Sequence, residues 1–242
     1  MFITIHCIAL HTVKHNDKSN ILSVFSLEQG RMALLLPAGT SKEAVRRRAL
    51  TMPLSIFECV ADIRPGREIS SIRDVKPLIV ATTIHSHPIK ITVAIFIAEL
   101  LGVVLREVQA DRPLYIYIQD AIAHLDNADD TATANFPIAF LYKLGRFLGI
   151  EPDISTYAPR RVFDLIDGRF RDTPPLHRRY IEAEEAAAIA MLSRMTWDNL
   201  GHFKYNRHQR RRILAAIIEY YALHYASLSS LNSINVLQSL FD

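Results

Sequence analysis

The spacing of apolar residues changes character near residue 80 of this chain. Before that point, apolar residues come in short runs typical of β-strands, separated by polar turns and by one longer basic segment. The predicted strands cover residues 2–13, 21–27, 31–36, 49–63 and 69–80. Five short strands with a longer central insertion favour a small closed barrel of the OB type, because a flat sheet would leave its edges unprotected.

After residue 80, nearly every apolar run has helical spacing. The predicted helices cover residues 89–108, 112–126, 136–149, 183–195, 197–203, 207–226 and 234–241. A hairpin that turns at Asp167 and Gly168 is predicted over residues 163–172. The sequence thus predicts an α+β chain of two domains, a five-stranded OB-fold β-barrel over residues 1–80 and an all-helical C-terminal domain over residues 81–242 that contains the small hairpin.

Charge is distributed unevenly between the two predicted domains. The whole chain carries 28 Lys and Arg against 25 Asp and Glu, a net charge of +3. Residues 1–80 contain eleven basic and seven acidic residues, whereas the remaining 162 contain seventeen and eighteen. A basic β-domain joined to a near-neutral helical domain indicates binding of a polyanion, above all nucleic acid, rather than small-molecule chemistry.

Neither a membrane anchor nor secretion is indicated. The most apolar stretch, residues 91–105, is too short to span a bilayer and contains Glu99, so it predicts a buried helix. The N-terminal residues alternate like a strand and lack the features of a signal peptide. Cys7 and Cys59 lie far apart in sequence within apolar runs, which predicts buried thiols in a reducing cytosol and no Cys-based zinc site.

Two clusters of basic residues are the candidate binding sites. The first lies in the central segment of the predicted barrel, and we expect the hairpins to bring further basic side chains close to it. Its members are Lys42, Arg46, Arg47 and Arg48, with Lys14, Lys18 and Arg31 expected nearby. Such a segment is either a solvated charged loop or a basic rim that holds nucleic-acid backbone.

The aromatic residues of the predicted barrel indicate how it would bind nucleic acid. Residues 1–80 contain Phe2, Phe25 and Phe57 and no Tyr or Trp, and all three lie in strand patterns where core packing is expected. A barrel that holds single strands by stacking needs exposed aromatic side chains. We therefore expect binding directed mostly at phosphates, with weak sequence preference and strong salt dependence.

The second cluster precedes and begins the helix predicted at residue 207. It consists of Lys204, Arg207, Arg210, Arg211 and Arg212. Asn206 is a candidate N-cap with Gln209 three residues later, and the positive pole of the helix macrodipole at this end disfavours cations. The arginines are explained either by an anionic partner, DNA or protein, or by acidic groups elsewhere in the fold.

Catalytic and metal-binding motifs are not found in the sequence. His85 and His87 form an H-S-H-P segment without a third ligand nearby, so we expect neither a metal nor a cofactor. Walker, nucleophile-elbow, zinc-protease and dinucleotide fingerprints are all missing. The sequence therefore predicts a protein that is not an enzyme.

Several segments, in their order and spacing, resemble the RecO family of bacterial recombination mediators, in its Bacteroidetes variant. They are IALHTVKHNDKSNILSVFSLEQGRMALLLPAG, ANFPIAFLYKLGRFLGIEPD, FDLIDGRF followed by PPLH, and RRRILAAIIEYYALH followed by INVLQSLF. Many RecO proteins carry a four-cysteine zinc site near the hairpin, but residues 157–174 contain no cysteine here. The resemblance thus implies a zinc-free member in which packing around the hairpin replaces the metal.

The resemblance also implies a function and partners. RecO proteins combine an OB-fold with a helical domain, bind single- and double-stranded DNA and anneal complementary strands. They contact RecR and the acidic, apolar tail of single-stranded-DNA-binding protein (SSB), and they help recombinase to load, which implies a cytoplasmic, nucleoid-associated protein of bacteria. The alternative from another class is a protein–protein adaptor, in which the barrel is a structural cap and the helical domain binds a partner's acidic tail.

Overall fold

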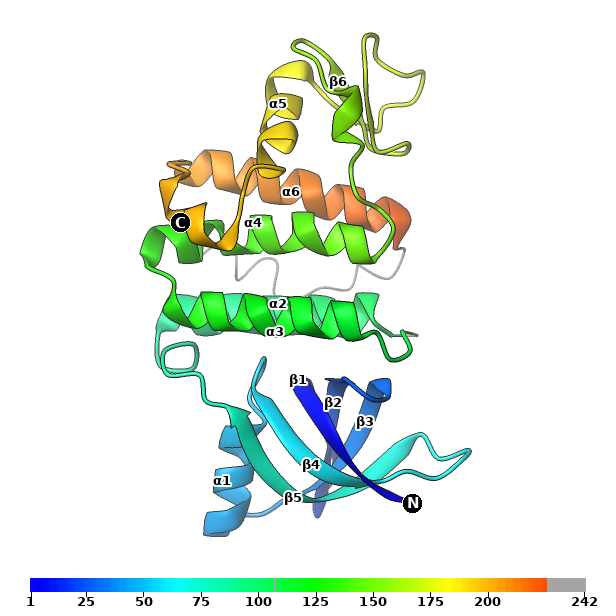
Figure 1. The fold of residues 1–242 in the computed structure, drawn as a ribbon, viewed down its shortest axis with the longest axis vertical. Helices are drawn as coiled ribbons and strands as arrows, with labels where there is room; N and C mark the ends of the chain where they lie inside the picture. The colour runs from blue at the N-terminus through cyan, green and yellow to red at the C-terminus, as the bar shows by residue number, and fades with distance from the viewer. Residues whose placement is uncertain (107, 226–242) are drawn as a thin grey trace. The chain divides into compact units, whose positions relative to one another are not determined.

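A computed structural model describes residues 1–106 and 108–225 (Figure 1). The chain divides into two compact units, Met1–Asn127 and Ala128–Asp242, and each is described by itself below. The helices between residues 88 and 127 belong to the same unit as the strands. The predicted domain boundary at residue 80 was placed where strands give way to helices. The division into domains 1–80 and 81–242 stays a prediction.

The first unit contains the predicted barrel. Its strands are β1 (Phe2–Asn16), β2 (Ser19–Ser26), β3 (Gly30–Pro37), β4 (Ile56–Asp62) and β5 (Ile69–Ile79), closed in the order β1-β2-β3-β5-β4. The β3–β5 pair is parallel and the other pairs are antiparallel. This architecture confirms the OB-type barrel expected from the apolar pattern.

Alternate residues of the strands fill the barrel. Ile5 and Cys7 of β1 and Phe57 and Cys59 of β4 are at most 1% exposed, as period-two alternation with one buried face requires. Both cysteines are free thiols. Burial, followed by the adjacent Cys59, raises the pKa of Cys7 well above its usual value, so this thiol stays protonated inside the apolar core.

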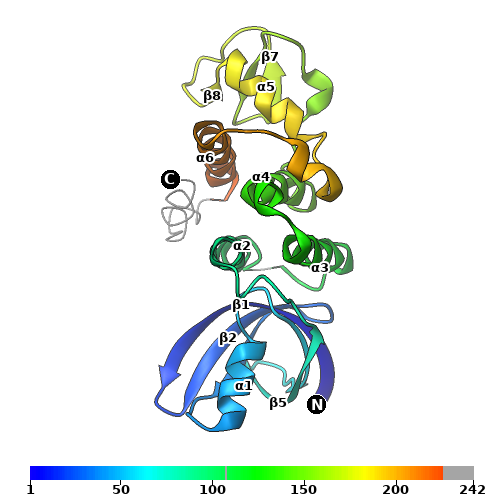
Figure 2. The same cartoon turned by 90° about the vertical axis from the view of Figure 1, so that its left-hand side faces the viewer.

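The segment between β3 and β4 differs from the prediction. Residues 42–50 form helix α1 (Lys42–Leu50) rather than a basic loop, and the strand predicted over residues 49–63 is reduced to β4. Ser41 caps α1 by accepting a hydrogen bond from the Ala44 N–H, and Arg47 and Arg48 lie in its last turn, where the macrodipole favours cations. Helix α1 lies beside β5 (Figure 2).

Helices α2 (Pro88–Val104) and α3 (Arg112–Asn127) complete the first unit. The connection from β5 to α2 is attached to the end of α3 by Asp126. Its carboxylate accepts hydrogen bonds of 2.7 to 2.9 Å from the backbone N–H groups of Thr82, Thr83 and Ile84. Burial opposes ionisation, but these three bonds and the Thr82 hydroxyl lower the pKa of Asp126 to about 2.

The second unit is mostly helical, as predicted. It contains α4 (Asp130–Phe147), α5 (Ala183–Leu192) and α6 (Arg207–His224), with short 3-10 helices η1 (Ile154–Thr156) and η2 (Trp197–His202). Helix α4 begins six residues before the predicted start at 136. Asp129 caps the helix by accepting from the Ala132 N–H, and Pro137 lies within it.

Buried polar contacts join the helices of the second unit. Asn135 of α4 is fully buried and donates to the carbonyls of Leu200 and Phe203, at 2.9 and 2.8 Å. Tyr221 of α6 donates to the carbonyl of Leu141 at 2.6 Å. Trp197 packs on Phe136 with ring centroids 5.1 Å apart. These contacts fix η2 and α6 against α4.

A small sheet replaces the simple hairpin predicted over residues 163–172. Strands β6 (Val162–Asp164) and β7 (Arg169–Arg171) form that hairpin, and β8 (Tyr180–Ile181) pairs with the other side of β6. The two-residue β8 is too short to produce a periodic signal. We call β6, β7 and β8 the mini-sheet. The helix predicted over residues 234–241 lies outside the described residues, as does the last residue of the helix predicted over 207–226.

Candidate nucleic-acid interface

The tip of the β1–β2 hairpin presents two of the predicted lysines. Lys14 pairs with Asp17 at 2.8 Å, with both side chains largely exposed. Lys18 is exposed as well, and its carbonyl accepts a 2.8 Å hydrogen bond from the N–H of Ala38, just after β3. This bond joins the hairpin tip to the segment that leads into α1, so the lysines and α1 lie at the same end of the barrel.

Helix α1 adds the other predicted basic residues at that end. Lys42 and Arg46 are exposed. Arg47 pairs with Glu43 at 2.7 Å, and Arg48 donates to the carbonyl of Gly39 at 2.7 Å. The expectation that this cluster lies on a loop is therefore wrong, since the helix presents all four residues. Arg47 and Arg48 are thus held by contacts with Glu43 and Gly39, while Lys42 and Arg46 extend into solvent.

A groove of about 410 Å³ separates α1 from the barrel wall. Thr12 and Asn20 line the barrel side, and Arg47 and Arg48 line the helix side. His11 also borders the groove, and burial, followed by the charge of Arg31, lowers its pKa. His11 is therefore neutral near pH 7, and the arginines supply the positive charge of the groove.

Arg31 does not belong to this cluster. It pairs with Phe25 near the far end of β2, whereas Pro37 at the other end of β3 pairs with Ser19, beside the hairpin tip. Six residues of strand correspond to about 20 Å. Arg31 is half-buried, donates to the carbonyl of Met32 at 2.9 Å, and has its pKa lowered by burial and by Arg106. The expectation that the hairpins bring Arg31 to the other cations is wrong.

The barrel aromatics divide into two kinds. Phe25 and Phe57 are fully buried, as predicted. Phe2 is 57% exposed, with the guanidinium of Arg73 4.3 Å from its ring centroid, so the expectation of core packing is wrong for this residue. Phe2 lies on the outer face of β1. In the alternation of the strand it shares the face of Thr4, not that of the buried Ile5 and Cys7.

The second basic cluster is held mostly by contacts within its own unit. The predicted capping box is confirmed, because Asn206 accepts from the Gln209 N–H and Gln209 accepts from the Asn206 N–H, both at 2.9 Å. Arg210 donates to the carbonyl of Tyr205, and Arg212 pairs with Glu185 of α5. These two arginines thus have internal partners.

The remaining members of that cluster lie at the surface. Lys204 donates to the carbonyl of Gly201 at 2.8 Å, and Arg207 and Arg211 are exposed. A groove of about 270 Å³ between α5 and α6 is lined by apolar side chains together with Glu184, Glu185 and Arg212. Its mixed rim is less basic than the surface made by α1 and the β1–β2 hairpin.

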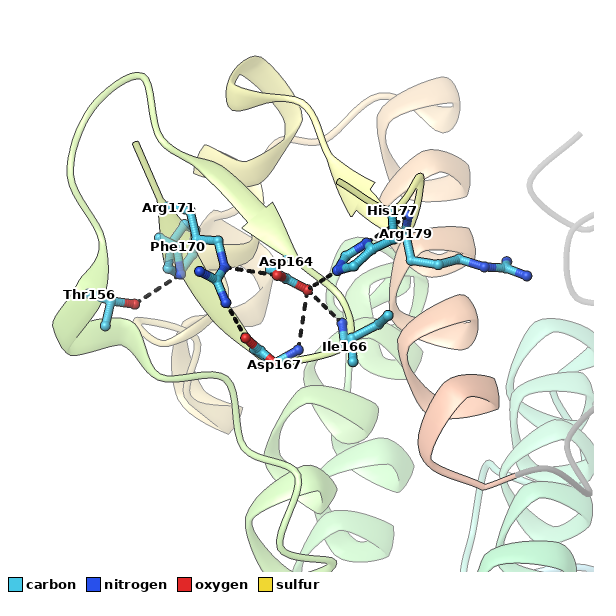
Figure 3. Close-up of polar contacts among 8 residues, drawn as sticks. All are labelled: Thr156, Asp164, Ile166, Asp167, Phe170, Arg171, His177 and Arg179. Atoms are coloured by element: carbon cyan, nitrogen blue, oxygen red, sulfur yellow. Dashed lines mark hydrogen bonds and ion pairs between the residues drawn. The ribbon is translucent and has the colours of Figure 1, made fainter. Parts of the chain in front are cut away.

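A buried carboxylate that sequence reasoning missed organises the mini-sheet (Figure 3). Asp164 is 1% exposed and accepts from the backbone N–H groups of Ile166 and Asp167, at 2.9 and 3.2 Å. Arg171 donates to it at 2.8 Å, and His177 lies 3.4 Å away. Burial opposes ionisation, but the backbone bonds, then His177 and Arg171, lower the pKa of Asp164.

This network occupies the place where the family resemblance implied packing in place of zinc. Among the described residues, no group of three or more His, Cys, Asp or Glu side chains could hold a metal ion. No helix in the described ranges, 1–106 and 108–225, is long and apolar enough to cross a membrane.

The Asp-Leu-Ile-Asp-Gly segment was the one sequence signal for the network around Asp164. Aspartate at the first position of a turn accepts hydrogen bonds from backbone N–H groups.

Comparison with known proteins identifies the family. The model for the N-terminal part of recombination protein O matches residues 1–79, and the model for its C-terminal part matches residues 85–232. The chain is 38% identical to the DNA repair protein RecO of Bacteroides fragilis over 236 residues, covering 97% of both chains. Identity is 35% with RecO of Phocaeicola vulgatus, over 97% of both chains, and 34% with RecO of Porphyromonas gingivalis, over the whole of both. The chain belongs to the RecO family of DNA repair proteins.

Proposed function

We propose that this chain binds the backbone of single- and double-stranded DNA and anneals complementary strands without catalysing a covalent step. The observation that carries the proposal is the basic surface at one end of the barrel. It comprises Lys14, Lys18, Lys42, Arg46, Arg47 and Arg48. Neutralising phosphate charge on two strands reduces their repulsion, and base pairing then drives annealing.

The salt dependence of binding tests the proposal. If the surface neutralises about six phosphates of a single strand, log K falls against log salt with a slope of roughly −4 to −5. Fluorescent single-stranded DNA is titrated with the protein at several salt concentrations, and annealing is then followed with SSB-coated strands. A slope close to zero would refute binding directed at phosphates.

Variants locate the binding surface. Lys42 and Arg46 are exposed, whereas Arg47 and Arg48 contribute contacts to α1, so K42E/R46E changes the surface with the least effect on folding. R106E/R112E reverses two exposed charges at other positions of the same unit and serves as the matched control. We expect K42E/R46E alone to weaken DNA binding tenfold or more, about 1.4 kcal/mol. Equal losses in both variants would contradict the assigned surface.

Partner binding is the second part of the proposal. The family resemblance suggests contacts with a RecR-like protein, and with the acidic, apolar tail of SSB in aid of recombinase loading. The groove between α5 and α6 favours the apolar part of such a tail through Ile181, Ile189 and Ile213, whereas Glu184, Glu185 and the paired Arg212 give its rim no net positive charge. A labelled SSB-tail peptide tests this, and A188E, at a half-buried residue of the groove, should abolish its binding while leaving DNA binding intact. Unchanged peptide affinity would reject the groove.

A further inference from the structure

The mini-sheet and its flanking loops are unusually rich in arginine. Residues 157–180 contain six arginines, one histidine and no lysine, against three aspartates. The arginines are Arg160, Arg161, Arg169, Arg171, Arg178 and Arg179. The segment therefore carries a net charge of +3 with His177 neutral, equal to that of the whole chain.

The aspartates of this segment are used in holding it together. Asp164 is buried under Arg171 and His177, and Asp167 pairs with Arg171 at the turn. The two carboxylate oxygens of Asp172 accept hydrogen bonds from Nε and Nη2 of Arg161, at 2.8 and 3.0 Å. Arg161 and Arg171, together with His177, engage these three carboxylates, which leaves four arginines that do not pair with the aspartates of the segment.

Strand register places Arg169 and Arg171 on the same face of the mini-sheet. Phe163 and Phe170 are directly paired and point inward, where Phe163 contacts Tyr220 of α6 with ring centroids 5.8 Å apart. Arg169 and Arg171 flank Phe170 and therefore point outward. The outer face of β7 thus presents arginine at both of its outward positions.

The four remaining arginines are exposed and weakly held. Arg160 and Arg178 are exposed and have no carboxylate partner among residues 1–106 and 108–225. Arg169 lies 3.4 Å from Asp153, and Arg179 lies 3.1 Å from Glu219, with the arginine side chains 63% and 57% exposed. Figure 3 shows Arg179 extending away from Asp164. Exposed pairs of this kind exchange readily for another anion.

We propose that the exposed arginines of the mini-sheet and its flanking loops, Arg160, Arg169, Arg178 and Arg179, bind the phosphodiester backbone of a second DNA segment. The inference rests on the proposed function, and it adds a binding site on a unit separate from the barrel. Arginine forks pair with two phosphate oxygens at once, and phosphate contacts predominate in DNA interfaces. A chain with two such surfaces holds two strands at the same time, as annealing requires.

The test measures capture of one strand by another through the protein. A biotinylated strand is immobilised, the full-length protein is added, and a labelled strand of non-complementary sequence is offered. R160E/R178E changes two exposed side chains that pair with no carboxylate among residues 1–106 and 108–225, and R146E/R194E reverses two other exposed charges of the same unit as the control. We expect R160E/R178E to reduce capture and annealing tenfold or more. Binding of a single strand, which the barrel provides, should change much less.

Three outcomes contradict the inference in different ways. Capture that is equal for wild type, R160E/R178E and R146E/R194E would overturn the second site while leaving the barrel surface in place. A loss in L176A as large as that in R160E/R178E would show an apolar, peptide-type surface, because Leu176 is fully exposed beside Arg178. Absence of all DNA binding by the wild type, including the single-strand titration, would refute the proposed function itself.

Discussion

Replacing Asp126 by asparagine tests the attachment of residues 82–84 to the end of α3. One carboxylate oxygen accepts from the Thr82 N–H and hydroxyl, and the other accepts from the N–H groups of Thr83 and Ile84. Asparagine retains one acceptor oxygen and presents an NH2 group where the second oxygen was. That group meets N–H donors and cannot pair with them.

The magnitude follows from the pKa of Asp126. Its decrease from 3.8 to about 2 is a difference of about 1.8, which corresponds to about 2.4 kcal/mol between protonation states. Because the carboxylate is partly exposed, solvent screening reduces this to about 1 to 2 kcal/mol. The folded pKa is depressed, so this stability is present above pH 4 and is lost as the pH falls towards 2. At pH 3 about half of it remains.

The assay combines denaturation with hydrogen exchange. Urea unfolding of the wild type and D126N is followed by far-UV circular dichroism at pH 7 and pH 3, and exchange is measured at the amides of Thr82, Thr83 and Ile84. D120N is the control, because Asp120 lies on the same helix with its side chain 55% exposed. Equal destabilisation by D126N at both pH values would refute the electrostatic reasoning, as would unchanged exchange at the three amides.

Three further substitutions test other contacts. D164N should destabilise the second unit by about 2 to 3 kcal/mol, since the charge that faces Arg171 is lost, and the fluorescence of Trp197 in the same unit reports its unfolding. G30A should cost about 2 kcal/mol or more in urea unfolding, because Gly30 has φ +71° and an added Cβ would lie 2.4 Å from the carbonyl carbon of Gln109. N135L leaves the carbonyl groups of Leu200 and Phe203 without their donor and should lower the stability of the second unit by about 2 kcal/mol, and an unchanged urea midpoint would contradict that role.

The barrel was largely predictable because its signal is local. Alternation in β1 and β4 identifies the inward residues, and the turn residues between strands limit each element. Helix α1 was missed because its sequence, K-E-A-V-R-R-R-A-L, has one buried residue, Ala44, and so no apolar stripe. Its N-cap Ser41 and the charges at its ends were the available signals.

The candidate site was predictable in its residue types but not in its geometry. Composition indicated basic side chains for phosphate, yet it could not place Arg31 at the opposite end of β3 from the hairpin tip, because register depends on non-local pairing. The arginines of the mini-sheet were overlooked for a related reason. The net charge of residues 157–180 is present in the composition, but the structure is needed to show which arginines are left over once Asp164, Asp167 and Asp172 are paired.

The buried thiols of the barrel make the folded protein suited to site-specific labelling. The chain has two cysteines, and burial keeps both from maleimide dyes, which react with exposed thiolate. A T173C variant would therefore carry a single reactive position, on the exposed loop that connects β7 to β8, without removal of either native cysteine. A donor dye at that position and an acceptor on DNA would report arrival of a strand at the mini-sheet in real time.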